Sequence, residues 1–265
     1  MMMTGESPMT LPQKSVLAAR DAYTPRRTPD AVPPKTLFER LTRLLGFHLP
    51  PDLHEWTSEI GLTLPLGTKR HERMALIAQR GVLFVHVPKN AGTSIATALY
   101  GRTLSHESMR YYLDVVPHLA HTLPSVAILR DPVERFISAY RYARDGGSRH
   151  RSVVPAFRDR YMAFRSVDDA LDHIEQARSV YQMDHIFRPQ SWYVTDKSGQ
   201  PAVRYLVHLR DIGRLPDLVP ELSTLRLPHL NESRSYALNL TGRQLARIEA
   251  FYHRDFALFD HLTIR

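Results

Sequence analysis

The chain has 265 residues, 43% of them hydrophobic, which is enough to bury the core of one large domain or two small ones. Its formal net charge of +8 predicts a surface that attracts anions such as nucleotides, acidic glycans, nucleic acids or anionic lipids. It contains no cysteine, which excludes disulfides and thiolate metal sites.

Proline, threonine, serine and arginine are frequent in the first part of the chain, a composition typical of a segment without fixed structure. We therefore expect a flexible N-terminal arm over 1–35 and a single domain over 36–265. The sequence has neither a signal-peptide core nor a run of about 18 apolar residues, which predicts no membrane span. The expected location is the cytoplasm, and peripheral contact with a membrane stays open.

The first part of the expected domain has helical and loop patterns. Thr36 and Glu39 have the spacing of a capping box and open a short amphipathic helix that Gly46 ends. Residues 50–65 begin and end with proline and are expected to form a loop. Residues 71–79 are expected to form another helix that leads into the first strand.

The most informative segment spans residues 81–100. An apolar run, expected to form a strand at 82–86, is followed by Pro88 and small residues, and then by a helix expected at 93–100. Small residues let backbone N–H groups approach an anion, and the helix N-terminus adds partial positive charge. The pattern therefore predicts a phosphate cradle. Its binding groups are expected to come from Lys89, Asn90, Ala91, Gly92, Thr93 and Ser94.

This cradle differs from the loop that binds nucleoside triphosphates. That loop places its lysine at the helix start, next to a serine or threonine that binds magnesium. Here Lys89 precedes Gly92, and the sequence contains no Gly-Lys-Ser or Gly-Lys-Thr. Considered alone, the segment also allows an ordinary strand, turn and helix with an exposed lysine.

A second segment with phosphate-binding character follows at residues 125–142. An apolar strand is expected at 126–129 and is followed by Arg130. The Asp-Pro pair at 131–132 is then typical of a helix N-terminus, and a helix is expected at 132–144. An arginine fork beside a serine hydroxyl suits a phosphate group. Arg130 and Ser138 are therefore expected to bind a second phosphate.

Other basic side chains of this region are interpreted differently. Arg135 is expected to form a structural ion pair with Asp131 or Glu134. Residues 145–165 are rich in arginine and contain two glycines, which predicts a long loop. The sequence leaves open whether that loop covers a substrate or is only a solvated basic surface.

Strand and helix patterns alternate along the rest of the chain. A helical pattern covers 167–178, a strand is expected at 203–209, and a final helix at 241–256. This alternation predicts the α/β class, with a P-loop-like parallel sheet flanked by helices. Both phosphate segments follow the carboxyl end of a strand, which is the edge where parallel sheets bind ligands.

The two phosphate segments together resemble a pair of motifs in a known enzyme family. Pro-Lys-x-Ala-Gly-Thr-Ser at 88–94 and Arg-Asp-Pro-x-x-Arg-x-x-Ser-Ala-Tyr at 130–140 are similar to motifs of sulfotransferases that use 3′-phosphoadenosine-5′-phosphosulfate (PAPS). The first resembles the 5′-phosphosulfate loop and the second the 3′-phosphate motif. The pattern is most similar to the carbohydrate, or family 2, branch. Later segments also resemble that branch, at 184–191, 227–233 and 251–259.

The resemblance implies the sulfotransferase fold and in-line transfer of a sulfuryl group from PAPS to an acceptor hydroxyl, with no metal required. Lys89 would then stabilise the negative charge that grows on the leaving phosphate. Thr93 and Ser94 would bind the 5′-phosphate, and Arg130 with Ser138 the 3′-phosphate. The acceptor implied is a carbohydrate or glycoconjugate, including an anionic glycan.

An alcohol acceptor needs a general base, and histidine suits this role because its pKa lies near neutrality. Family members often carry such a histidine between the first helix and the second motif, where this chain has His106, His118 and His121. His118 is the preferred candidate because it lies just before the strand of the second motif. Glu107 is the reserve candidate.

Residues in the later segments have weaker predictions. His185 and Arg188 are candidates for lining the acceptor or nucleotide cleft, with a structural role equally open. The late polar residues are expected to close over the nucleotide: Asn231, Ser233 and Arg234.

Two other functions are considered. A P-loop kinase or other nucleotide phosphotransferase would need a Walker-type lysine and magnesium ligands, and the sequence shows neither. A basic module that binds nucleic acid or another polyanion would fit the charge, but no such binding motif is present. We therefore expect no nucleic-acid partner, while the sequence does not give the acceptor or the oligomeric state.

Overall fold

The computed structural model describes residues 49, 51–148, 151–226 and 238–263. Several sequence predictions lie outside these residues and are not tested. They are the arm over 1–35, the helix that begins after Thr36, and the nucleotide-covering residues Asn231, Ser233 and Arg234.

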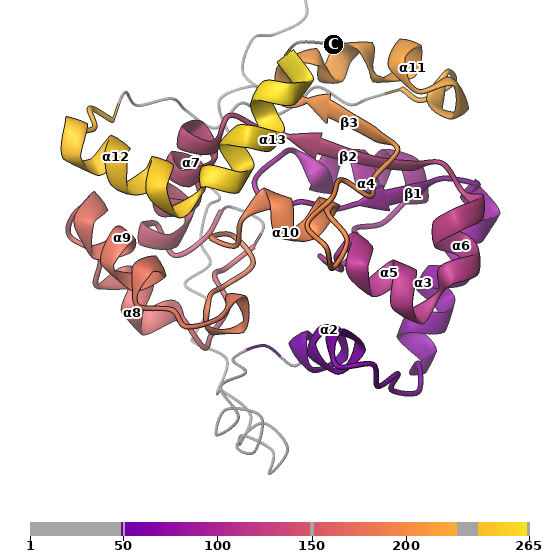
Figure 1. Cartoon of the computed structure of the whole chain (residues 1–265), viewed down its shortest axis with the longest axis horizontal. Helices are drawn as coiled ribbons and strands as arrows, with labels where there is room; N and C mark the ends of the chain where they lie inside the picture. Colours follow the sequence, from indigo (N-terminus) through magenta and orange to yellow (C-terminus); the bar gives the residue numbers. More distant parts are fainter. Residues whose placement is uncertain (1–48, 50, 149–150, 227–237, 264–265) are drawn as a thin grey trace, which may run out of the picture.

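A parallel sheet forms the centre of the structure (Figure 1). In the described residues it consists of β1 (Leu83–Val85), β2 (Ser125–Leu129) and β3 (Tyr205–His208), in the order β1-β2-β3. All residues of β1 and β2 are buried, which agrees with their continuous apolar sequences, since helices cover both faces of such sheets. The predicted α/β class, with helices flanking a parallel sheet, is confirmed.

The first two strands each lead through a short loop into a helix. β1 is followed by α4 (Gly92–Tyr100) and β2 by α7 (Pro132–Arg144), close to the predicted bounds. The Asp131 carboxylate accepts a hydrogen bond from the Glu134 amide at 2.9 Å, so the predicted capping signal forms the start of α7. Both helix starts lie at the carboxyl edge of the sheet.

The chain before β2 is more helical than predicted. The expected loop at 50–65 is wrong, because α2 (Asp52–Glu59) lies there, held by buried carboxylates that contact distant segments. The helix predicted at 71–79 is confirmed as α3 (Thr68–Arg80). Two further helices lie between α4 and β2, namely α5 (Met109–Val115) and α6 (Pro117–Thr122).

The second half of the chain differs from prediction in two places. The loop expected at 145–165 contains α8 (Arg158–Met162). The helix expected at 241–256 is divided into α12 (Gly242–Phe251) and α13 (His253–Thr263). The remaining described elements are α9 (Val167–Glu175), η1 (Val180–Gln182), α10 (Gln190–Val194), η2 (Leu209–Arg214), α11 (Leu215–Leu218) and η3 (Pro220–Leu222).

Buried apolar side chains of the described residues form two groups. One surrounds the sheet and includes side chains of α3, α4 and α5, and the other lies between α7, α8, α9 and α12. In Figure 1 the strands run toward α7, whereas α6 lies at their opposite end, beside the start of β2. The loop from β2 to α7 therefore connects the apolar group around the sheet to the apolar group around α7.

Candidate functional site

The loop between β1 and α4 has an unusual backbone. Lys89 has φ 70° and Ala91 has φ 57°, so two residues with side chains adopt the left-handed conformation. Such turns can aim successive backbone N–H groups at one point, which makes them anion-binding concavities. The strained backbone at Lys89 and Ala91 supports the predicted phosphate cradle.

Gly92 is the first residue of α4 and lies against the ring of His86. A Cβ at this position would overlap the ring carbon Cδ2 and the ring nitrogen Nε2 of His86. Glycine at this position therefore allows the buried His86 ring to pack against the start of α4. This close approach, rather than a positive φ, is the reason for glycine here.

Asn90 and Gln190 connect the two phosphate segments. The Asn90 side-chain amide donates to the Ile128 carbonyl at 2.7 Å and to the Gln190 side-chain oxygen at 2.6 Å. The same Gln190 oxygen accepts from the Arg130 backbone N–H at 3.0 Å, and its amide donates to the Arg130 carbonyl at 2.8 Å. The side chain of Asn90 thus holds the loop after β1 against the loop after β2.

Arg135 does not form the ion pair expected from the sequence. It is 1% exposed, and its Nε donates to the Pro88 carbonyl at 3.1 Å, which supports the phosphate loop from α7. The acidic neighbour Glu134 instead pairs with Arg130, with 3.2 Å between Nε and Oε2. Among the described residues, no carboxylate forms an ion pair with Arg135.

The Lys89 side chain contacts α7, the helix that carries Ser138. Its Nζ is 4.1 Å from the centroid of the Tyr142 ring, and Tyr142 and Ser138 share one face of α7. Burial, together with the positive charges of Arg130 and Arg135, lowers the pKa of Lys89 to about 8, while Asp184 acts in the opposite direction. The structure therefore brings these cations together, and a bound anion would relieve their repulsion.

Three histidines lie beside the phosphate loop. The ring centroids of His86 and His106 are 4.2 Å apart, and those of His106 and His185 are 5.3 Å apart. His106 Nδ1 is 3.1 Å from the His86 carbonyl, and His86 Nδ1 is 3.2 Å from the Leu104 carbonyl. These pairs join the end of β1 to the segment after α4.

The same contacts set the protonation of His106. Burial lowers the pKa of His106 to about 4, so the imidazole is neutral at physiological pH. Since Nδ1 faces a carbonyl acceptor, the neutral ring carries its proton there and keeps the lone pair on Nε2. His106 therefore presents a neutral ring with a lone pair at this edge, but its low pKa makes it a weak base, and the negative charge of a bound ligand would raise that pKa toward neutrality.

The structure does not bring His118 and His121 together with Lys89. Both are exposed on α6, which ends three residues before β2 begins and therefore lies at the amino edge of the sheet. Lys89 and Arg130 lie at the carboxyl edge, and Figure 1 shows α6 and α7 at opposite ends of β2. This placement does not fit the predicted role of His118. The reserve candidate Glu107 is buried and paired with Arg73.

Arg188 has a structural role rather than a place in a cleft. It is fully buried, and its Nη1 and Nη2 donate to both oxygens of the buried Asp52 carboxylate, at 2.9 and 2.5 Å. Asp52 belongs to α2, which the sequence did not reveal. His185 is partly exposed, and its Nδ1 lies 3.2 Å from the Tyr193 hydroxyl.

The late segments 184–191 and 251–259 hold each other in place. The Asp255 carboxylate accepts from the backbone N–H groups of Gln190 and Ser191, at 2.7 and 2.8 Å. The Tyr252 hydroxyl donates to the Phe187 carbonyl at 2.7 Å, at the point where α12 and α13 meet. These residues position Gln190, and through it the two phosphate segments.

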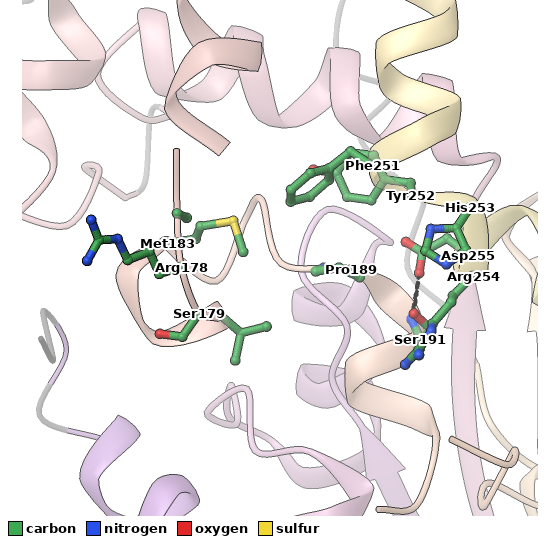
Figure 2. A pocket seen from close by; sticks show the side chains of 12 residues that line it. Arg178, Ser179, Met183, Pro189, Ser191, Phe251, Tyr252, His253, Arg254 and Asp255 are labelled. Atoms are coloured by element: carbon green, nitrogen blue, oxygen red, sulfur yellow. Dashed lines mark hydrogen bonds between the residues drawn. The ribbon is translucent and has the colours of Figure 1, made fainter. Parts of the chain in front are cut away.

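A separate pocket of about 270 Å³ lies beside this support (Figure 2). Figure 2 shows the hydrogen bond between Ser191 and Asp255 at one wall, near His253 and Arg254. None of the residues predicted to bind phosphate lines it. Its lining includes Ala177, Val180, Met183, Pro189 and Phe251.

Within the described ranges, no group of three or more histidine or acidic side chains is arranged to hold a metal ion. No helix in that part of the chain has both the length and the apolar character needed to cross a membrane.

Comparison with known proteins gives one match. A family model described as "Sulfotransferase family" matches residues 73–261, which include both phosphate segments and the late segments. A search of curated proteins finds no match to the chain.

Proposed function

The chain belongs to the sulfotransferase family, and from this premise we propose that it moves the sulfuryl group of PAPS to an acceptor hydroxyl. The observation that carries the proposal is the bridge formed by Asn90 and Gln190. It holds the loop after β1 and the loop after β2 at one edge of the sheet. Two anion-binding loops at a fixed separation suit a donor with phosphate groups at both ends of its ribose.

Each end of the donor has a proposed set of ligands. The Lys89 ammonium, the N–H groups of residues 90–94 and the hydroxyls of Thr93 and Ser94 bind the 5′-phosphosulfate. Arg130 and Ser138 bind the 3′-phosphate. Arg130 is partly exposed, and its pairing with the exposed Glu134 can be exchanged for a phosphate. The buried Arg135 instead maintains the loop through Pro88.

We propose His106, rather than His118, as the general base. Its Nε2 lone pair accepts the proton of the acceptor hydroxyl as the oxygen attacks the sulfur in line. The bond between sulfur and the bridging oxygen then breaks, and Lys89 stabilises the charge that develops on the leaving 5′-phosphate. The His86 carbonyl holds Nδ1–H and stabilises the imidazolium that results.

The acceptor class follows from resemblance and charge. The family 2 branch that the motifs resemble acts on carbohydrate, and the net charge of +8 favours anionic partners. A sugar hydroxyl on a glycan or glycoconjugate is therefore the proposed acceptor. The cytoplasmic location stays a prediction from sequence.

Calorimetry with 3′,5′-ADP, the desulfated product of PAPS, tests the donor site. The wild type is expected to bind 3′,5′-ADP more tightly than AMP. Arg130→Ala should weaken 3′,5′-ADP binding far more than AMP binding, and Lys89→Ala should abolish transfer of radiolabelled sulfate. Equal losses for both nucleotides, or binding of magnesium-ATP in place of 3′,5′-ADP, would contradict the proposal and favour a phosphotransferase.

Two histidine variants test the base. His106→Ala is expected to lower kcat by roughly 10²–10⁴-fold, the usual contribution of general base catalysis, with the affinity for 3′,5′-ADP retained. His118→Ala is the matched control and should leave kcat unchanged. The reverse result would return the role to His118.

A further inference from the structure

The pocket in Figure 2 lies between two parts of the chain that are distant in sequence. Residues within 177–191 form one side, and residues 251–255, where α12 meets α13, form the other. Its volume is about 270 Å³, which suits a ligand smaller than those of typical small-molecule pockets, of about 300–1,000 Å³. The pocket is separate from the proposed transfer site, since neither the proposed phosphate ligands nor His106 line it.

The body of the pocket is apolar. Figure 2 shows Met183, Pro189 and Phe251 along it, and Ala177 and Val180 also belong to the lining. Burial of apolar surface is the main driving force for filling such a pocket. A ligand that fits it therefore needs an aliphatic or aromatic body.

Positive charge gathers at one end of the pocket. His253 and Arg254 line it and are the first two residues of α13, so the partial positive charge of the helix N-terminus adds to that of the guanidinium. Arg254 is exposed, and no carboxylate of the described residues forms an ion pair with it. Arg178 borders the opposite side, where Figure 2 shows its guanidinium pointing away from Met183. The start of α13 is therefore the end that suits an anionic group.

Asp255 is the one carboxylate among the described residues that line the pocket. It is 1% exposed, and it accepts hydrogen bonds from the Gln190 N–H at 2.7 Å and the Ser191 N–H at 2.8 Å. The Ser191 hydroxyl donates to it at 2.6 Å. These three bonds offset its negative charge, so Asp255 does not oppose an anion at Arg254.

We propose that this pocket binds a small amphipathic carboxylate, and that its occupant strengthens binding of the donor. The apolar body lies against Met183 and Phe251, and the carboxylate pairs with Arg254, whose planar fork matches it. The effect on the donor rests on the proposed function, whereas binding in the pocket does not.

The connection to the donor site runs through Gln190. Pro189 and Ser191 line the pocket on either side of Gln190, whose side chain joins the two phosphate segments. A ligand that contacts both sides of the pocket stabilises the arrangement in which Asp255 holds the Gln190 N–H. Since the donor uses the same bridge, each ligand should increase the affinity for the other by the same factor.

Three probes separate the two parts of the ligand. Octanoate, 1-octanol and butyrate are titrated into the full-length protein by calorimetry. Octanoate should bind roughly threefold or more tighter than 1-octanol, the contribution of an exposed ion pair. It should bind more than about tenfold tighter than butyrate, which lacks four methylene groups. No binding of octanoate, or equal affinity for octanoate and either other probe, would overturn the proposal.

Two substitutions assign the binding to the pocket. Ala177→Phe fills part of it and should weaken octanoate binding, with Ala246→Phe at an exposed position of α12 as the matched control. Arg254→Met keeps much of the side-chain stem and should bring the affinity for octanoate close to that for 1-octanol. Arg243→Met changes an exposed arginine of α12 outside the pocket and should leave octanoate binding unchanged. Wild-type octanoate affinity in either pocket variant would overturn the assignment.

Titration of 3′,5′-ADP with and without saturating octanoate tests the effect on the donor. Octanoate should raise the affinity for 3′,5′-ADP roughly fivefold or more, the lower end of typical coupling between two sites. An unchanged or lowered affinity would overturn the coupling. A wild type that binds octanoate but not 3′,5′-ADP would overturn the proposed function and the coupling, while the ligand of the pocket would be confirmed.

Discussion

The Lys89 ammonium lies 4.1 Å from the centroid of the Tyr142 ring, which joins the loop after β1 to the helix after β2. An aromatic face attracts a cation without neutralising it. The ammonium therefore has a defined position and keeps its charge for the proposed donor. The Tyr142 hydroxyl lies 3.3 and 3.2 Å from the carbonyl oxygens of Arg151 and Ser152, which orients the ring.

Two substitutions of Tyr142 should separate the role of its ring from the role of its hydroxyl. Tyr142→Leu removes the ring contact, worth about 0.5–2 kcal/mol, and is expected to lower kcat several-fold. Tyr142→Phe keeps the ring and should retain most of kcat. The measurements are kcat and KM for sulfate transfer. If the Leu and Phe variants behave alike, the ring does not position Lys89.

The lowered pKa of Lys89 predicts the pH dependence of donor binding. Burial, with Arg130 and Arg135, brings this pKa to about 8, and only the protonated form attracts the donor. Affinity for 3′,5′-ADP is therefore expected to be full below about pH 8 and to fall as pH rises through that value. Lys89→Arg retains the charge at higher pH and should remove the fall. An unchanged fall in that variant would assign it to another group.

The sequence predicted the parts of the fold that local signals determine. The capping aspartate and proline at 131–132 correctly placed the start of α7, and apolar runs placed β1 and β2. The two segments that we propose bind phosphate could be identified as candidates because each follows a strand directly. Their location at one sheet edge follows from the parallel arrangement.

Long-range contacts account for what the sequence did not predict. α2 was taken for a loop because its stability depends on Asp52 and Arg188, which are 136 positions apart. Arg135 was assigned an ion pair with a neighbour, whereas it bonds to the Pro88 carbonyl. Our proposal of His106 rather than His118 as the base depends on the contact between His106 and the His86 carbonyl, which the sequence does not reveal.

Gly92→Ala tests the close packing of α4 on His86. The added methyl group would overlap the buried ring, and we expect a loss of about 1–3 kcal/mol in the free energy of unfolding, with weaker 3′,5′-ADP binding. Adding His86→Ala should restore part of the nucleotide affinity, because the overlap is removed. Gly242→Ala is the control, since open space surrounds that position. Chemical denaturation and calorimetry provide both readouts.

The buried pair of Asp52 and Arg188 should be important for stability. Both side chains are fully buried, so Asp52→Asn or Arg188→Met leaves a charge without its counterion and should cost about 3–5 kcal/mol. Asp52→Leu combined with Arg188→Met removes both charges and should cost less than the sum of the single changes. The partly exposed pair of Lys197 and Asp114 is the control, where Lys197→Met should cost about 1 kcal/mol or less. Additive losses in the double variant would contradict coupling.

Glu55 predicts a pH dependence of stability. Its carboxylate is 3% exposed and accepts from the Ser108 N–H and hydroxyl, each at 2.7 Å, but burial outweighs these bonds and raises its pKa from 4.5 to about 7.

The folded state therefore holds a proton between these values that the unfolded state releases. Stability from this group is present below pH 4.5 and is lost as pH rises to about 7, by on the order of 3 kcal/mol. Glu55→Gln keeps the shape of the side chain and should reduce this slope in denaturation curves. Asp184, whose pKa burial raises to about 6, should account for part of the remaining slope. Glu72→Gln, at an exposed position of α3, should leave the slope unchanged, and an equal effect of both variants would remove Glu55 as its source.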